Sequence, residues 1–190
     1  MSVDFAAQRY SMVESQVRVA DVTDYAIQDA MRIVPREALL APQKRYLAYA
    51  DIEVAYAPGR WLLKGRDVGK LLQALKPRAG ERALAIAAPY AAAVLEAMGL
   101  VVTRHDEGDL AAPPAGPYDL AVCEGAVSQV PEAWWQGLEP GGRLAAVERS
   151  GPVGRAVLYV RTETGAGRRD LFDCAPPIMA GFAPQAAFTF

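Results

Sequence analysis

The segment ERALAIAAPYAAAV, residues 81–94, joins a buried-strand pattern directly to a helix pattern and contains no glycine. In nucleotide-binding α/β proteins the backbone between such a strand and helix approaches the ligand closely, and glycines normally permit that approach. Here the connection is Ala87-Ala88-Pro89. Proline is tolerated in the first turn of a helix, because its missing N–H group would have no partner there. The segment therefore predicts a strand, a tight turn and a helix without a glycine-rich ligand loop.

The flanking sequence extends this α/β pattern. An amphipathic helix is expected over residues 22–34, capped by Thr23 or Asp24 and stopped by Pro35. The other expected elements follow from apolar periodicity and turn residues. They are helices over residues 5–19, 42–49, 68–75, 90–98 and 131–138, a short strand or extended link over 51–56, and strands over 83–86, 100–104, 119–123, 143–147, 156–162 and 169–172.

The stretch HDEGDLAAPPAGPY, which follows Arg104, has three prolines and no apolar periodicity, so it is expected to be a loop. A helix of about 11 residues and a strand of about 5, with their turns, do not fit into it. The predicted sheet is therefore shorter by about one helix-strand unit than a regular α/β alternation would give.

The chain of 190 residues has the length of one domain and can bury roughly 70% of its unfolded surface. We expect a single domain over residues 1–190, with a helical lead-in over residues 1–50 and an α/β core with C-terminal strands over residues 51–190. Neither an internal repeat nor a low-complexity linker divides it.

Charge and composition exclude several classes of function. The net charge is −2 and the basic residues are scattered, which argues against a nucleic-acid partner. Cys123, Cys174 and the single histidine, His105, have no metal-ligand or catalytic-triad spacing, so no metal site and no catalytic residue is expected. The N-terminus lacks a signal-peptide pattern, and the alanine-rich run 83–102 is broken by Pro89 and Gly99. We expect a cytoplasmic protein without membrane insertion.

A series of short motifs runs through nearly the whole chain: MVESQVR, VTD, AMRIVPRE, LAYAD, LLQALKP, GER, PYDLAV, VPEA, LEPGGRL and, in the tail, VGRA and LFD. In order and spacing the chain resembles the protein-L-isoaspartate O-methyltransferase family, and most closely a divergent bacterial branch. The resemblance implies a Rossmann-like methyltransferase sheet with an N-terminal helical extension. It also implies binding of S-adenosylmethionine and methylation of the α-carboxyl group of L-isoaspartyl residues in damaged proteins.

The sequence departs from this family where the cofactor would bind. The family carries an acidic residue and a glycine-rich loop, approximately E-x-G-x-G-S-G-Y, where this chain has Ala85-Ile86-Ala87-Ala88-Pro89-Tyr90. A helix and strand that form part of the adenine pocket are missing after Arg104. The substrate loop T-I-S-x-P corresponds to residues 60–65, which contain neither a hydroxyl group nor a proline.

Five residues remain as candidates for cofactor contacts if the chain is active. They are Ala87 and Tyr90 at the loop, Asp106 and Glu107 after the second strand, where the family holds the ribose, and Glu124 at the carboxyl edge of the sheet. The alternative roles are a solvated charge run for Asp106 and Glu107, and a carboxylate that caps nearby N–H groups for Glu124.

Methyl transfer depends mainly on positioning the methyl donor against its acceptor. Because the loop that would position the donor is lost, we expect a protein that no longer binds S-adenosylmethionine, and we expect no cofactor. It would then act as a binding or structural module, with a protein partner or a second copy of itself. Trp134, Trp135, Phe188 and Phe190 are candidate contact residues, or ordinary core residues. The alternative is an active S-adenosylmethionine-dependent protein-L-isoaspartate O-methyltransferase with an unusual cofactor pocket.

Overall fold

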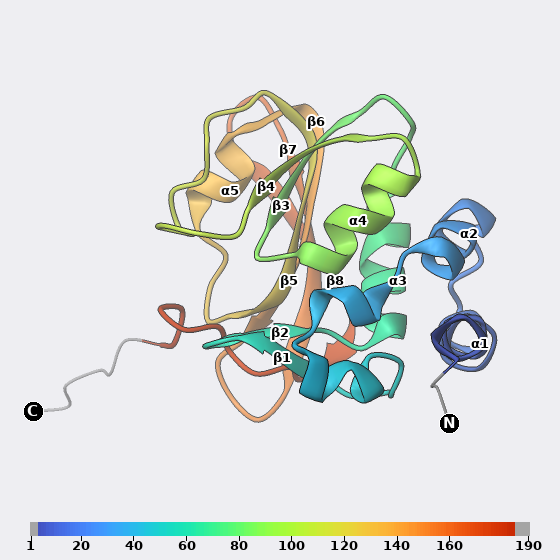
Figure 1. The fold of residues 1–190 in the computed structure, drawn as a ribbon. Coiled ribbons are helices and arrows are strands. Elements are labelled where there is room, and N and C mark those ends of the chain that lie inside the picture. Colours follow the sequence, from blue (N-terminus) through green and yellow to red (C-terminus); the bar gives the residue numbers. More distant parts are fainter. Residues whose placement is uncertain (1–3, 185–190) are drawn as a thin grey trace, which may run out of the picture.

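A six-stranded sheet with the strand order β4-β3-β5-β6-β7-β8 forms the centre of the molecule (Figure 1). The computed structural model describes residues 4–184. The sheet strands are β3 (Arg82–Ile86), β4 (Val101–His105), β5 (Tyr118–Val127), β6 (Leu138–Arg149), β7 (Gly154–Arg161) and β8 (Ala166–Cys174). Strands β4, β3, β5 and β6 are parallel, whereas β7 and β8 are added by antiparallel pairing. Two short strands, β1 (Val54–Ala57) and β2 (Arg60–Leu62), form a separate antiparallel pair.

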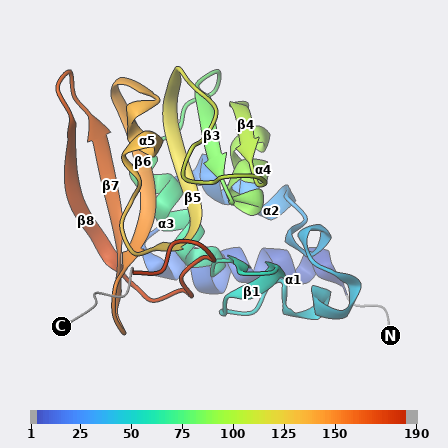
Figure 2. The same ribbon diagram turned by 90° about the vertical axis from the view of Figure 1, so that its left-hand side faces the viewer.

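Helices cover the two faces of the sheet unequally. Helices α3 (Gly65–Leu75) and α4 (Pro89–Ala97) pack on one face, and α1 (Phe5–Met12) and α2 (Tyr25–Ile33) lie outside them (Figures 1 and 2). The opposite face carries the short α5 (Glu132–Gln136) and irregular segments. Single turns complete the lead-in: a π-helical η1 (Val13–Val17) and the 3-10 turns η2 (Arg18–Ala20), η3 (Arg36–Leu39) and η4 (Pro42–Leu47). The expected α/β class with an N-terminal helical extension is confirmed.

The shortened sheet predicted after Arg104 is also confirmed. Residues 106–117 contain no helix or strand, and β4 is the edge strand of the sheet. Leu110 from this loop is buried on the less covered face, where its carbonyl oxygen accepts a hydrogen bond of 2.7 Å from Trp134 Nε1. The loop thus folds over the sheet in place of a regular helix.

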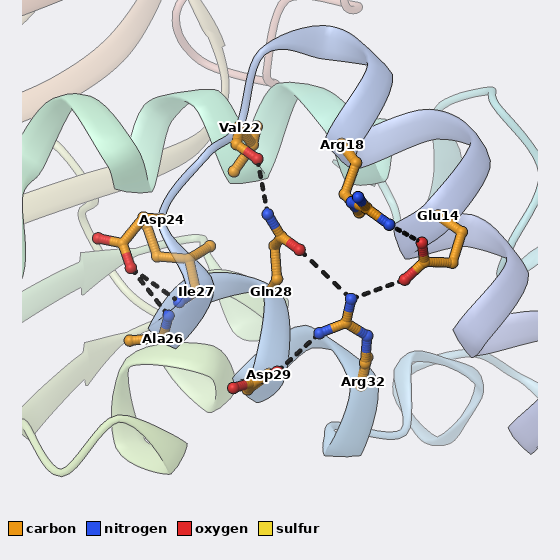
Figure 3. A network of polar contacts seen from close by, with 9 residues as sticks. All are labelled: Glu14, Arg18, Val22, Asp24, Ala26, Ile27, Gln28, Asp29 and Arg32. Carbon is orange, nitrogen blue, oxygen red and sulfur yellow. Dashed lines mark hydrogen bonds and ion pairs between the residues drawn. The ribbon is translucent and has the colours of Figure 1, made fainter.

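A polar network fastens α2 to the preceding η1 turn (Figure 3). Arg32 Nη2 lies 2.7 Å from Glu14 Oε1, and its Nη1 lies 2.6 Å from Asp29 Oδ1. Gln28 donates to the carbonyl oxygen of Val22 at 2.9 Å. At the start of α2, Asp24 accepts hydrogen bonds from two backbone N–H groups of the first turn, as an N-cap residue does. The helix expected over residues 22–34 is therefore confirmed as α2, and Asp24, one of the two expected cap residues, is its N-cap.

The start of strand β6 differs from the sequence prediction. Strand β6 begins at Leu138 and runs through Gly141 and Gly142, which were predicted to form a turn. Its pairing with β5 is irregular at this end, and the left-handed φ of Gly141, +83°, accommodates the distortion.

Among residues 4–184, no helix is both long and apolar enough to cross a bilayer.

Candidate functional site

The turn between β3 and α4 is closed by the chain's own hydrogen bonds. Ala87 adopts a left-handed φ of +44°, unusual for a residue with a Cβ atom. Its N–H group donates to the carbonyl oxygen of His105 at 3.0 Å, and its carbonyl oxygen accepts from the Tyr56 hydroxyl at 3.4 Å. Ala87, Ala88 and Pro89 are buried. The backbone that would face a ligand in a glycine-rich loop is therefore covered and already paired.

Glu124 from β5 occupies the N-terminus of α4. Its Oε2 atom accepts hydrogen bonds from the backbone N–H groups of Tyr90, at 3.0 Å, and Ala91, at 3.2 Å. Oε1 accepts a third, from Leu63 N at 3.2 Å. Pro89 has no N–H group to offer. A helix N-terminus is a natural site for an anion, because its first N–H groups lack partners within the helix. Here an internal carboxylate takes that position.

Arg36 from the helical lead-in completes a buried polar cluster around Glu124. Neither side chain has more than 1% of its surface exposed, and Arg36 Nη1 lies 3.8 Å from Glu124 Oε1. Arg36 donates through Nε to the carbonyl oxygen of Ala48 at 2.7 Å, and through Nη2 to that of Leu63. The guanidinium also lies over the ring of Tyr90, 4.8 Å from its centroid. Within the described residues, Arg36 Nη1 and the Tyr90 hydroxyl are buried without a hydrogen-bond partner.

Burial dominates the electrostatics of this cluster. It raises the pKa of Glu124 to about 7, although Arg36 and the three backbone N–H groups act in the opposite direction. Burial also raises the pKa of the Tyr90 hydroxyl far above its ordinary value. Glu124 therefore titrates near neutrality inside the folded protein.

This titration predicts a pH dependence of stability. A carboxyl group whose folded pKa is raised stabilises the folded state below its unfolded pKa of 4.5, and that contribution is lost as pH rises through about 7. Urea unfolding should therefore show a loss of roughly 3 kcal/mol from Glu124 between these pH values. In Glu124→Gln this part of the slope should vanish. An unchanged slope in the variant would mean that Glu124 does not titrate in this window.

The C-terminal segment covers the carboxyl end of β5. Met179 N donates to the carbonyl oxygen of Ala126 at 2.8 Å, and Ser128 N to that of Phe182 at 2.9 Å. A Cβ atom at Gly125 would lie 2.5 Å from Met179 Sδ, so this glycine makes room for the chain itself. The carboxyl edge of the parallel strands, where open α/β sheets bind ligands, is thereby filled by protein atoms.

The structure brings four of the five candidate cofactor residues together. Ala87, Tyr90 and Glu124 meet at the β3–α4 turn. Asp106 adjoins them, because the preceding residue, His105, accepts the hydrogen bond from Ala87 N. Burial, and then the charges of Glu124 and Asp106, raise the pKa of the Tyr56 hydroxyl, which donates to Ala87 O. Glu107 is exposed, as a solvated charge would be. Asp106 is half-buried, and its Oδ1 atom is buried without a hydrogen-bond partner among residues 4–184. Cavities of about 260 to 410 Å³ lie elsewhere on the described surface, and none of these is lined by any of the five residues.

Sequence analysis did not identify the partners of Glu124. Arg36 lies within the motif AMRIVPRE. The signal that could have identified it is an arginine directly after Pro35, the residue that ends the predicted helix, with apolar residues close by on both sides. Among the candidate contact residues, Trp134 is a core residue with 0% exposure, and Trp135 is half-buried with Arg161 over its ring. Phe188 and Phe190 lie outside the described residues.

Comparison with known protein sequences gives a consistent result. Residues 93–164 match the family model "Protein-L-isoaspartate(D-aspartate) O-methyltransferase (PCMT)". A protein-L-isoaspartate O-methyltransferase from Methylorubrum extorquens is 32% identical over 94% of this chain and 91% of its own length. One from Methylorubrum populi is 32% identical over 92% of this chain and 96% of its own length.

Solved structures agree with the fold. A protein-L-isoaspartate O-methyltransferase structure superposes on 94% of this chain and 67% of its own, with a TM-score of 0.71 at 16% identity. A proposed enzyme of this kind from Plasmodium falciparum, in complex with S-adenosyl-L-homocysteine, covers 90% of this chain and 97% of its own, with a TM-score of 0.73 at 14% identity. At these identities the likeness establishes a shared architecture.

Proposed function

The chain belongs to the protein-L-isoaspartate O-methyltransferase family, and on this premise we propose that it is a member that acts as a binding or structural module without methyl transfer. The observation that carries the proposal is the Glu124 carboxylate on the N-terminus of α4, with hydrogen bonds from Tyr90 N and Ala91 N at 3.0 and 3.2 Å. This carboxylate takes the position that the α/β architecture offers to a ligand.

The residues at the turn do not fit S-adenosylmethionine. The cofactor needs a backbone that approaches it closely and offers free polar groups. Ala87 has its N–H and carbonyl groups in internal hydrogen bonds, and Met179 fills the space over Gly125. Methyl transfer depends on holding the methyl donor against its acceptor with water excluded, so a turn that cannot hold the donor removes the main source of catalysis. A protein that keeps its packed core but has lost its cofactor loop can still act as a binding or structural module.

The partner of such a module is proposed to be another protein or a second copy of this chain. Without the missing helix-strand unit, β4 is the sheet edge, and Val101 on it is 64% exposed. Sedimentation analysis across a range of concentrations would distinguish self-association from a monomer that awaits another partner.

A second candidate is an active S-adenosylmethionine-dependent protein carboxyl methyltransferase. The comparisons support this candidate better than the first, because the relatives at 32% identity carry the enzyme's name and a structural relative binds S-adenosyl-L-homocysteine. One feature of the site also favours it. Asp106 Oδ1, just after β4, is a buried acceptor without a hydrogen-bond partner in the part of the chain that the structure describes, and a ribose hydroxyl could donate to it there. Glu107 and Glu124 are the other carboxylates available for cofactor hydroxyl groups.

Calorimetric titration with S-adenosylmethionine and S-adenosylhomocysteine separates the two candidates. For the module we expect no saturable heat at ligand concentrations up to roughly 1 mM, where a binding free energy of about −4 kcal/mol would be detected. Affinity in the micromolar range would overturn the proposal and establish the second candidate.

Two variants test whether any binding of the cofactor depends on the Asp106 carboxylate. If the cofactor binds through Asp106, Asp106→Asn should weaken binding about tenfold or more, since it removes a buried charged acceptor. Glu163→Gln, on an exposed carboxylate in the turn between β7 and β8, is the control and should leave affinity unchanged. Methylation of an isoaspartyl peptide would then test the reaction itself.

A further inference from the structure

A cavity of about 260 Å³ lies at the amino ends of the parallel strands, away from the β3–α4 turn. It is bounded by the end of α3, the loop that leads to β3, and strands β6, β7 and β8. Its floor is apolar, because Leu75 and Leu158 belong to the hydrophobic core and Ala74 is half-buried beside them. Sites for drug-sized molecules take up roughly 300 to 1,000 Å³, so this cavity suits a smaller ligand.

The charges in the lining of this cavity are all of one sign. The remaining lining residues are Lys76, Arg78, Arg143 and Arg169, and no described carboxylate belongs to the lining. The chain as a whole has a net charge of −2. Each of the other described cavities that has a cation in its lining also has a carboxylate there. Positive charge is therefore concentrated at this cavity.

Two of the four cations are compensated by the protein itself. Arg143 Nη2 lies 3.0 Å from both carboxylate oxygens of Glu81, and Arg143 Nε donates to the carbonyl oxygen of Leu75 at 2.8 Å. Lys76 follows the last turn of α3, where the negative end of the helix dipole favours a cation. These two cations offset the charge of Glu81 and of the helix end, so neither is left to repel an anion in the cavity.

Arg78 and Arg169 have no such compensation. They come from different segments, the loop before β3 and the edge strand β8, and both are exposed. Among residues 4–184, neither guanidinium group forms an ion pair or a hydrogen bond, and only the backbone N–H group of Arg78 is engaged, by Glu81 at 2.8 Å. A guanidinium group can donate two parallel hydrogen bonds to one carboxylate or phosphate group. Two free arginines beside an apolar floor are therefore suited to an oxyanion that carries an apolar chain.

We propose that this cavity binds a small organic oxyanion, a carboxylate or a phosphate monoester with a short alkyl chain, with Arg78 and Arg169 as its cationic contacts. The alkyl chain lies on Leu75 and Leu158. An inorganic anion fits less well, because it would leave the apolar floor in contact with water. The site lies at the opposite ends of the strands from Glu124 and the β3–α4 turn, so its test succeeds or fails independently of whether the chain binds S-adenosylmethionine.

The test is an NMR titration of the ¹⁵N-labelled full chain with n-hexanoate at a constant ionic strength of about 0.15 M, where charges more than roughly 8 Å apart are largely screened. Hexanamide is the uncharged analogue of nearly the same shape. We expect saturable shifts for backbone signals of the cavity lining, with a dissociation constant of about 1 mM or below for hexanoate and at least about tenfold weaker binding of hexanamide. Acetate, which has the same charge and almost no alkyl chain, should also bind more weakly than hexanoate.

Three variants test the two arginines. Arg169→Gln should weaken hexanoate binding about fivefold or more, since it removes a charge-assisted hydrogen bond. Arg78→Gln, in the loop, should have a similar effect. Arg168→Gln is the matched control, because it makes the same change in charge one residue away, on the opposite face of β8, where Arg168 pairs with Glu148 and Asp170. It should keep the affinity within about twofold.

Any of three results would overturn the proposal: no saturable shift up to roughly 50 mM hexanoate, where even a weak site is occupied, equal affinity for hexanoate and hexanamide, or losses in Arg78→Gln and Arg169→Gln no larger than in Arg168→Gln. Unchanged thermal midpoints would confirm that the variants are folded. Once binding is established, n-pentyl phosphate, which has the same alkyl chain as hexanoate, distinguishes the source of the anionic group. Tighter binding of pentyl phosphate indicates a phosphate monoester, and tighter binding of hexanoate indicates a carboxylate.

Discussion

Replacement of Arg36 by methionine is expected to lower the free energy of unfolding by about 3 to 5 kcal/mol, because it leaves a buried carboxylate without its cation. Arg36 is 0% exposed. Its guanidinium pairs with the Glu124 carboxylate and donates hydrogen bonds to the carbonyl oxygens of Ala48 and Leu63. Methionine fills much of the same volume but supplies no donor. The loss should be larger at pH 8 than at pH 5. Arg36 lowers the pKa of Glu124, so its removal moves this pKa above the wild-type value of about 7, and the stability that ionisation gains from Arg36 is lost only at the higher pH. Urea unfolding at the two pH values measures both effects.

The matched control for this prediction is Arg104→Met. Arg104 pairs with Glu96 at 2.8 Å, but the two side chains are 36% and 44% exposed, so the loss should stay below about 1 kcal/mol. In the double variant Arg36→Met/Glu124→Leu, the destabilisation should be smaller than the sum of the two single effects, because no charge is left unpaired. A loss for Arg36→Met no larger than for Arg104→Met would refute the view that the buried pair organises this region.

Trp134→Ala is expected to cost about 3 to 5 kcal/mol of unfolding free energy. The side chain is fully buried, its Nε1 donates to the carbonyl oxygen of Leu110, and its ring centroid lies 5.6 Å from that of Phe182. These contacts join the loop after β4 and the C-terminal segment to the same face of the sheet. Chemical denaturation measures the stability, and hydrogen exchange should show faster exchange in residues 106–117 and 176–184.

Two comparisons separate packing from hydrogen bonding in this prediction. Trp134→Phe keeps most of the apolar contact and loses the donor, so a cost of about 1 to 2 kcal/mol is expected. Trp135→Ala, on the half-buried neighbour in the same helix, should cost less than Trp134→Ala. If the two alanine variants were equally destabilised, Trp134 would have no special role in holding the loop.

The fold could be predicted to a large extent because local patterns were strong. The alternation of strand and helix signals from residue 81 onward gave the parallel strands. The prolines after Arg104 indicated the loop and the missing helix-strand unit. In the structure β4 is the edge strand as a result. The pairing of β1 with β2 was not predicted, since β2 has three residues and its pairing depends on contacts made only in the folded chain.

The site was predicted only in outline. The absence of glycine indicated an altered turn, and a carboxylate that caps nearby N–H groups was one of the two roles expected for Glu124. That the capped groups are those of Tyr90 and Ala91, at the start of α4, was not predicted. Its cation, Arg36, comes from a segment 88 positions earlier in the chain, and nothing in local periodicity connects the two. The closure by Met179 likewise depends on a segment without regular structure. Long-range polar partners of this kind follow from tertiary packing, which a single sequence does not reveal.

Met179 N donates to Ala126 O and Ser128 N donates to Phe182 O, and these two hydrogen bonds also bear on the order in which the fold is completed during synthesis. Translation proceeds from the N-terminus, so residues 178–182 leave the ribosome after every strand of the sheet. Until they emerge, the carboxyl end of β5 stays uncovered, with Gly125 and the apolar face around Trp134 open to solvent. The carboxyl end of β5 is thus the last part of the sheet to be covered as the chain grows.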